Sequence, residues 1–213
     1  AGEITFSGMK TLTGRALAAG EFSFELYEGE NKLQTVTNAA DGSIAFSAIA
    51  YTLDDVGEHV YTVKEAKGDD EEITYDTTEY TVVVNVEDAG NGTLTAKANI
   101  DATALNFVNA FETEGSLILT AKKTLEGRAL EDGQFTFSLT GENENQTKTN
   151  VDGVVTFDAL TYDESDAGET YTYTVKETST SGNGYTVDST EYTVAVSVAL
   201  DEQNKLAITY TVD

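Results

Sequence analysis

The chain has 213 residues, and its 38 acidic and 12 basic side chains give a formal net charge of −26. Such a charge excludes nucleic acids and anionic membrane surfaces as natural partners, because both would be repelled. A hydrophobic share of 39%, with 11 Tyr and 9 Phe, indicates a folded protein rather than a disordered acidic tail. No apolar run approaches the roughly 18–20 residues of a membrane span, and no signal segment opens the chain, so we expect a soluble, mature protein.

The residue types that the chain lacks exclude several kinds of chemistry. There is no cysteine, and therefore no disulfide, thiolate metal site or cysteine nucleophile. His59 is the single histidine, and we expect it to have a structural role. The acidic runs at residues 69–72 and 163–166 lack the ligand spacing of a calcium loop and are expected to be solvated turns. The sequence predicts neither a metal site nor a cofactor.

Short alternating runs separated by Gly, Asn and Asp clusters predict an all-β fold in the first half of the chain. This pattern is typical of an immunoglobulin-like β-sandwich. The expected strands lie near residues 3–12, 21–27, 33–38, 43–48, 59–66, 73–76, 79–87, 93–100 and 104–111.

The second half repeats the first at an offset of 112 to 113 residues. Residues 10–24 return as residues 123–137, and the Tyr-Thr-Val-Lys-Glu run at residues 61–65 returns at residues 173–177. A repeat of this length predicts two tandem sandwich domains. We place them at residues 1–112 and 113–213, and expect the second to lack its last strand, because the strand at 104–111 has no counterpart.

Three polar residues of the first half are in phase with apolar residues of their own strands. Side chains two residues apart in a strand share a face. Lys10 alternates with Phe6 and Leu12, whereas Glu65 and Asn109 lie on the apolar faces of later strands. Each is therefore expected to face the core, where an unpaired charge is very costly.

Two interpretations of these residues follow from the pattern alone. In the first, they curl to solvent at strand ends, or form a Lys–Glu ion pair beside an Asn that bonds to backbone. In the second, the Lys amine attacks the Asn carboxamide, forms an intramolecular isopeptide bond and releases ammonia. Burial favours a neutral, nucleophilic amine, and a buried Glu can bond the amide oxygen and carry protons. The fold would hold both partners in contact.

Three motifs in this order resemble the pilin isopeptide-linkage repeat of Gram-positive pilin shafts and surface adhesins. They are the Lys-Thr-Leu-x-Gly-Arg-x-Leu-x-x-Gly-x-Phe-x-Phe opening, the Tyr-Thr-Val-Lys-Glu strand, and the closing Phe-Val-Asn-Ala-Phe at residues 107–111. The resemblance implies that Lys10 and Asn109 form the cross-link, assisted by Glu65.

In the second half the resemblance implies corresponding roles for Lys123 and Glu177. No asparagine there follows the Phe-x-Asn pattern, so the partner of Lys123 is absent from the sequence. Alternation with Leu119 and Leu125 places Lys123 on the apolar face, and Lys122 on the opposite one.

The resemblance implies a structural module of a cell-surface pilus or adhesin stalk. Its partners would be neighbouring repeats or subunits of the same fibre, and it would be held at the cell wall through regions outside this sequence. The triad would react once, so the chain would not be an enzyme in the turnover sense. The alternative is an adhesive module for a host glycan or protein, because exposed Thr and Tyr surfaces could bind either.

Overall fold

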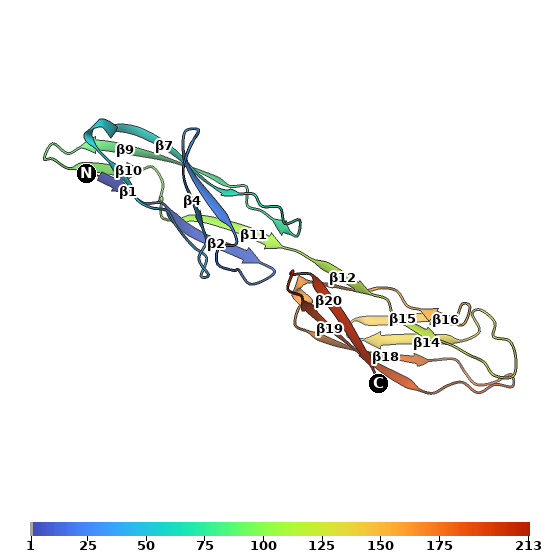
Figure 1. The fold of residues 1–213 in the computed structure, drawn as a ribbon. Coiled ribbons are helices and arrows are strands. Elements are labelled where there is room, and N and C mark those ends of the chain that lie inside the picture. The colour runs from blue at the N-terminus through green and yellow to red at the C-terminus, as the bar shows by residue number, and fades with distance from the viewer. Residues whose placement is uncertain (1) are drawn as a thin grey trace. The chain divides into compact units, whose positions relative to one another are not determined.

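The structure is a computed structural model that describes residues 2–213, and Figure 1 shows its course. The chain divides into two compact units, residues 1–112 and 113–213. Both are built from strands, as the sequence predicts. The helical segments in the described residues are two short 3-10 turns, η1 (Leu53–Asp55) and η2 (Glu164–Asp166). No helix in this part of the chain is long and apolar enough to cross a membrane.

The strands of unit 1 follow the expected order with two differences. They are β1 (Gly2–Ile4), β2 (Ser7–Thr13), β3 (Ser23–Glu28), β4 (Asn31–Thr37), β5 (Ser43–Ala45), β6 (Ile49–Tyr51), β7 (Gly57–Ala66), β8 (Ile73–Thr74), β9 (Glu79–Asp88), β10 (Leu94–Ala98) and β11 (Leu105–Phe111). The single strand expected at 3–12 is wrong, because it is split into β1 and β2. The short strand β6 was not expected.

Unit 1 is a sandwich of a five-stranded sheet, β10-β9-β7-β3-β4, and a four-stranded sheet, β5-β2-β11-β8. The split between β1 and β2 reflects a change of partner, since β1 pairs with β6 whereas β2 pairs with β5 and β11. At the break, Phe6 accepts a hydrogen bond from the Phe46 amide, and the Ser7 amide donates to Ala102. The alternation of inward-facing and outward-facing residues nevertheless continues from β1 into β2, although the ladder is interrupted.

The core of unit 1 lies between the two sheets. Phe24 and Val84 from the five-stranded sheet and Phe6 and Phe107 from the other side are almost wholly buried. The rings of Phe24 and Phe107 lie 5.1 Å apart, so the sheets meet through aromatic side chains. Alternation of apolar and polar residues places one face of each strand here, which is why the strands form at these positions.

The strands of unit 2 repeat this order, without counterparts of β8 and β11 among the described residues. They are β12 (Glu114–Leu117), β13 (Thr120–Lys122), β14 (Thr136–Gly141), β15 (Glu144–Thr149), β16 (Val154–Thr156), β17 (Leu160–Asp163), β18 (Thr170–Glu177), β19 (Glu191–Leu200) and β20 (Leu206–Val212). A five-stranded sheet, β15-β14-β18-β19-β20, faces the two ladders β12-β17 and β13-β16.

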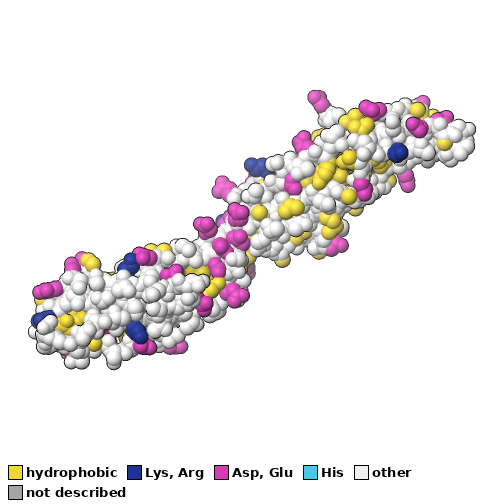
Figure 2. Space-filling view, turned by 180° about the vertical axis from the view of Figure 1, so that it is seen from behind, with side chains coloured by type: hydrophobic (Ala, Val, Ile, Leu, Met, Phe, Trp, Pro, Cys, Tyr) yellow, Lys and Arg dark blue, Asp and Glu magenta, His cyan; other side chains and the backbone are white. Residues whose placement is uncertain are grey.

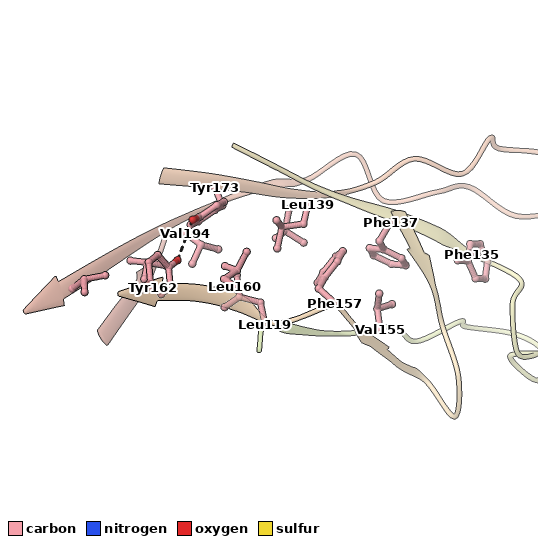
Figure 3. Packing of buried hydrophobic residues seen from close by; sticks show 13 residues of the cluster. Leu119, Phe135, Phe137, Leu139, Val155, Phe157, Leu160, Tyr162, Tyr173 and Val194 are labelled. Carbon is pink, nitrogen blue, oxygen red and sulfur yellow. Dashed lines mark hydrogen bonds between the residues drawn. The ribbon is translucent and has the colours of Figure 1, made fainter. Parts of the chain in front are cut away.

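Figure 3 shows the apolar residues that fill unit 2. Leu119 and Phe157 project from one layer towards Leu139 on the other. A buried pair, Tyr162 and Tyr173, joins the layers through hydroxyl groups 3.0 Å apart. In the described residues β13 pairs with β16 alone, so its other edge, where β11 lies against β2 in unit 1, has no strand beside it.

Acidic side chains are spread over the visible face in Figure 2, whereas Lys and Arg side chains are few and separated. The charge is therefore distributed, and no basic patch is present on that face.

Candidate cross-link site

Strands β2 and β11, the second and the last of unit 1, lie side by side in the four-stranded sheet (Figure 1). They run parallel, with Lys10 opposite Phe107 and Leu12 opposite Asn109. Parallel neighbours need a long crossover, and here nearly the whole unit forms it. Residues about 100 positions apart are thereby brought to adjacent places in one sheet.

A glycine makes this close approach possible. A Cβ atom built on Gly8 would lie 1.7 Å from the carbonyl oxygen of Leu105, far inside any permitted contact. In unit 2 the equivalent residue is Ala121. The two units therefore differ at the point where β11 first meets its neighbour.

Lys10, Glu65 and Asn109 meet in the core, and their expected burial is confirmed, with 2%, 7% and 0% of each residue exposed. The Lys10 Nζ donates to Glu65 Oε2 at 2.5 Å, and the Asn109 Nδ2 donates to Glu65 Oε1 at 2.5 Å. Of the first interpretation, the curl to solvent at strand ends is therefore wrong, whereas the Lys–Glu ion pair beside an Asn that bonds to backbone is present. One carboxylate holds the amine and the carboxamide on its two oxygens, and so brings them together.

The environment of Lys10 favours its neutral form. Burial lowers the pKa of the Lys10 amine, although its hydrogen bond to Glu65 and the charge of that carboxylate act in the opposite direction. The Phe22 ring lies 4.6 Å from the amine, and its face attracts an ammonium, so this contact acts in the same direction as Glu65. A proton can therefore leave Lys10 more easily than it leaves a lysine in water.

The carboxamide oxygen has a different partner from the one expected. The Asp76 backbone amide donates to Asn109 Oδ1 at 2.7 Å, whereas Glu65 contacts the carboxamide nitrogen. A backbone N–H can only donate, so this contact identifies the oxygen of the Asn109 side chain. The expectation that Glu65 bonds the amide oxygen is wrong, because the oxygen already faces the turn after β8.

Side chains from the turn and from β9 also bind the outer edge of β11. Asp76 Oδ2 accepts the Val108 amide at 2.7 Å, and the Tyr80 hydroxyl donates to the Asn106 carbonyl at 2.7 Å. Neither Asp76 nor Tyr80 belongs to the three motifs that point to the cross-link. The signal was available, because Asp and Tyr recur at 188 and 192 in the second half.

Unit 2 contains the same pair without the carboxamide. Lys123 Nζ donates to Glu177 Oε2 at 2.8 Å, with 10% and 2% of the two side chains exposed. Lys122 is exposed, as alternation predicts. The buried Glu177 Oε1 has no hydrogen-bond partner in the described part of the chain, and its equivalent in unit 1 is the oxygen that binds Asn109.

A cavity of about 420 Å³ lies beside this pair. Its lining includes Leu119, Lys123, Glu177, Asp188 and Tyr192, which come from both layers of the sandwich. Tyr192 is 46% exposed there, whereas its counterpart in unit 1, Tyr80, bonds to β11. The cavity therefore occupies the place in unit 2 that β11 fills in unit 1.

The residues expected to have structural roles have clear contacts. His59 Nδ1 lies 2.7 Å from a Glu28 carboxylate oxygen, and its Nε2 lies 2.7 Å from the Asp55 carbonyl. Arg15 binds the Glu21 carboxylate. Its counterpart Arg128 lies over the Tyr185 ring instead.

Comparison with known proteins agrees with this geometry. The profile of the FctA family, described as a Spy0128-like isopeptide containing domain, matches residues 6–112 and again residues 119–213. The chain belongs to this family. The two segments that the family profile matches lie within the two units of the fold, one in each. No curated protein matches the chain.

Several solved structures are similar over most of the chain. The major pilin protein T-13 of Streptococcus pyogenes is 18% identical over 100% of this chain and 94% of its own, with a TM-score of 0.34. The major pilin subunit BcpA of Bacillus cereus is 12% identical over 98% and 67%, at 0.35. The TIE protein of Bacillus anthracis is 20% identical over 89%, at 0.32, and this chain spans 30% of its length. Similarities this distant add nothing to the family match.

Proposed function

We propose that this chain is a structural module of a Gram-positive surface pilus or adhesin stalk, and that an isopeptide bond between Lys10 and Asn109 locks its first unit. The observation that carries the proposal is the shared carboxylate: Glu65 holds both reacting groups, and all three side chains are buried. Family membership supports the same chemistry. Neighbouring subunits of one fibre would be the partners, at the cell surface.

The proposed reaction needs no external reagent. A proton first passes from the Lys10 ammonium to the Glu65 carboxylate. The neutral amine attacks Cγ of Asn109, and the carbonyl electron pair moves to Oδ1. Glu65 then protonates Nδ2 and takes a proton from Nζ, after which the C–N bond to Nδ2 breaks. The products are one secondary amide and one ammonia, with Glu65 left protonated. The reaction therefore occurs once in each chain.

The consequence for a fibre is mechanical. A force applied to the two ends of unit 1 would pass through the bond from residue 10 to residue 109. Residues 11–108 would then carry none of it. The chain has no cysteine to provide a disulfide for this purpose, so an amide between side chains takes that role.

The test is the intact mass of the chain. We expect a mass lower than the sequence mass by one ammonia, and a branched tryptic peptide that joins the segments around Lys10 and Asn109. Glu65→Ala should give the full sequence mass in a chain that still folds. An unmodified parent chain would refute the bond, and complete cross-linking of Glu65→Ala would refute the role of Glu65.

For unit 2 we propose that Lys123 is a reactive amine held by Glu177. A peptide with an apolar-x-Phe-x-Asn-x-Phe sequence should couple to it in trans with loss of ammonia. Lys123→Ala should abolish the coupling, and Lys122→Ala should leave it intact, because the Lys122 side chain faces solvent. Loss of coupling in the Lys122 variant alone would show that the proposed nucleophile is wrong.

A further inference from the structure

Among the described residues, the Asn109 carboxamide hydrogen-bonds to one group besides Glu65. The Asp76 backbone N–H donates to Asn109 Oδ1 at 2.7 Å. Asp76 lies in the irregular segment between β8 and β9, outside the three motifs that define the site in the sequence. The carboxamide oxygen is the atom on which negative charge develops when an amine attacks Cγ.

The Asp76 side chain fixes the position of its own N–H. One carboxylate oxygen accepts the Thr78 amide at 2.8 Å and the other accepts the Val108 amide at 2.7 Å. The first bond closes the turn on itself, and the second ties the turn to the residue that precedes Asn109. Partial burial raises the pKa of Asp76, but these hydrogen bonds and the charge of Lys10 outweigh it, so its pKa is lowered and the carboxylate stays charged.

We propose that Asp76 is a positioning residue for the cross-linking reaction: its carboxylate bridges the turn and β11, and thereby aims the Asp76 N–H at the oxygen of Asn109. The inference rests on the Lys10–Asn109 bond proposed above. It assigns the two tasks of the reaction to different groups. Glu65 moves protons between the two nitrogens, and the Asp76 amide stabilises the oxyanion.

Unit 2 shows what the turn does when the strand is not beside it. Asp188 keeps the bond to its own turn, accepting the Thr190 amide at 2.9 Å. Its backbone N–H, however, donates to Glu177 Oε2 at 3.3 Å. The turn alone therefore does not create an oxyanion donor. The second anchor, between the carboxylate and the closing strand, is present in unit 1 and has no counterpart among the described residues of unit 2.

A neighbouring residue offers a matched control. Tyr80 also anchors β11, because its hydroxyl bonds the carbonyl and the amide of Asn106. It does not hydrogen-bond to the Asn109 side chain. Tyr80→Phe should therefore loosen the same strand without moving the N–H from the amide oxygen. If Asp76 served only to pin the strand, both substitutions would slow the reaction alike.

The experiment follows cross-linking during cell-free synthesis of the full chain. Samples are quenched in denaturant at intervals, and intact mass gives the fraction that has lost ammonia, while protease resistance gives the fraction folded. Among folded molecules we expect Asp76→Ala to react roughly 10- to 100-fold more slowly than the parent, because an oxyanion donor contributes about 10²–10³ in rate and is here displaced rather than deleted. Asp76→Asn keeps one acceptor and should be intermediate. Tyr80→Phe should change the rate less than about threefold.

The outcomes separate this inference from the one on which it rests. Cross-linking in the parent, together with equal rates in Asp76→Ala and Tyr80→Phe, would overturn the role of Asp76 and leave the bond in place. A parent chain that never loses ammonia would overturn both. If Asp76→Ala fails to fold, Asp76→Asn decides: a parental rate in that variant also overturns the proposal. Asp188→Ala, the same change in unit 2, should leave the rate of unit 1 unaltered.

Discussion

Replacing Glu65 by Gln should measure what the cross-link contributes to stability. Gln keeps the length and most of the shape of the side chain, but it cannot take the proton from Lys10. The variant should therefore fold with Lys10 and Asn109 unjoined. The bond closes a loop from residue 10 to residue 109. By the chain-entropy account of disulfides, a loop of about 100 residues contributes roughly 4.7 kcal/mol at 25 °C.

This free energy corresponds to a large thermal shift. Unit 1 has 112 residues. At about 2.1 cal/mol/K per residue, its unfolding entropy is roughly 0.24 kcal/mol/K, so losing the cross-link lowers the midpoint by about 20 °C. Differential scanning calorimetry should resolve the transitions of the two units, with unit 2 as an internal reference.

A matched substitution in unit 2 separates the contribution of the closed loop to stability from that of the ion pair. Glu65→Gln also removes the partner of a buried lysine, and Glu177→Gln does the same in unit 2, where Lys123 and Glu177 are similarly buried. The excess shift of unit 1 over unit 2 therefore reports the loop together with the contact between Glu65 and Asn109, which has no counterpart in the described residues of unit 2. Equal shifts, with ammonia loss abolished in Glu65→Gln, would refute the assignment of this stability to the cross-link.

Three further predictions follow from individual contacts. Both ring nitrogens of His59 face acceptors, and its hydrogen bonds to the Asp55 carbonyl and to Glu28 raise its pKa above the ordinary 6.5. The stability that these bonds give to unit 1 should be complete below pH 6.5 and be lost as pH rises through the raised pKa, and calorimetry of His59→Phe should show no such loss. Gly8→Ala should block or slow ammonia loss in the parent chain, since its methyl group would overlap the β11 backbone, and unchanged cross-linking would contradict this. A peptide with the β11 sequence should couple to Lys123 faster in Ala121→Gly than in the parent, measured by mass, and equal rates would show that the methyl group is no barrier.

Much of the site could be predicted because it depends on alternation. Lys10, Glu65 and Asn109 are spaced in phase with apolar neighbours, and strand periodicity carries such residues into the core whatever the details of the sheets. The position of Lys123 followed in the same way. The period-two pattern predicts which face of its strand each residue occupies. This predicted that Lys10, Glu65 and Asn109 all face the core.

The contacts around the amide oxygen could not be predicted in this way. The contact to the oxygen comes from the Asp76 backbone N–H, which every residue except proline has, so the recurrence of Asp at 188 marks the side chain but not this contact. The split between β1 and β2 was missed for a related reason. The apolar alternation continues through Phe6, and the interruption comes from a change of pairing partner that only the packed sheets determine.

Both units contain a Lys–Glu pair at the same place, but the hydrogen bonds of the glutamate differ between them. In unit 1 each oxygen of Glu65 has a donor, and the turn amide binds the carboxamide. In unit 2 the Glu177 Oε1 is buried without a partner among the described residues, a condition that costs about 1–3 kcal/mol. A strand that carries an Asn into the cavity would supply that donor and would let the Asp188 amide move from Glu177 to the new oxygen. Binding and chemistry would then favour the same occupant, because the groups that select a carboxamide are those that activate it.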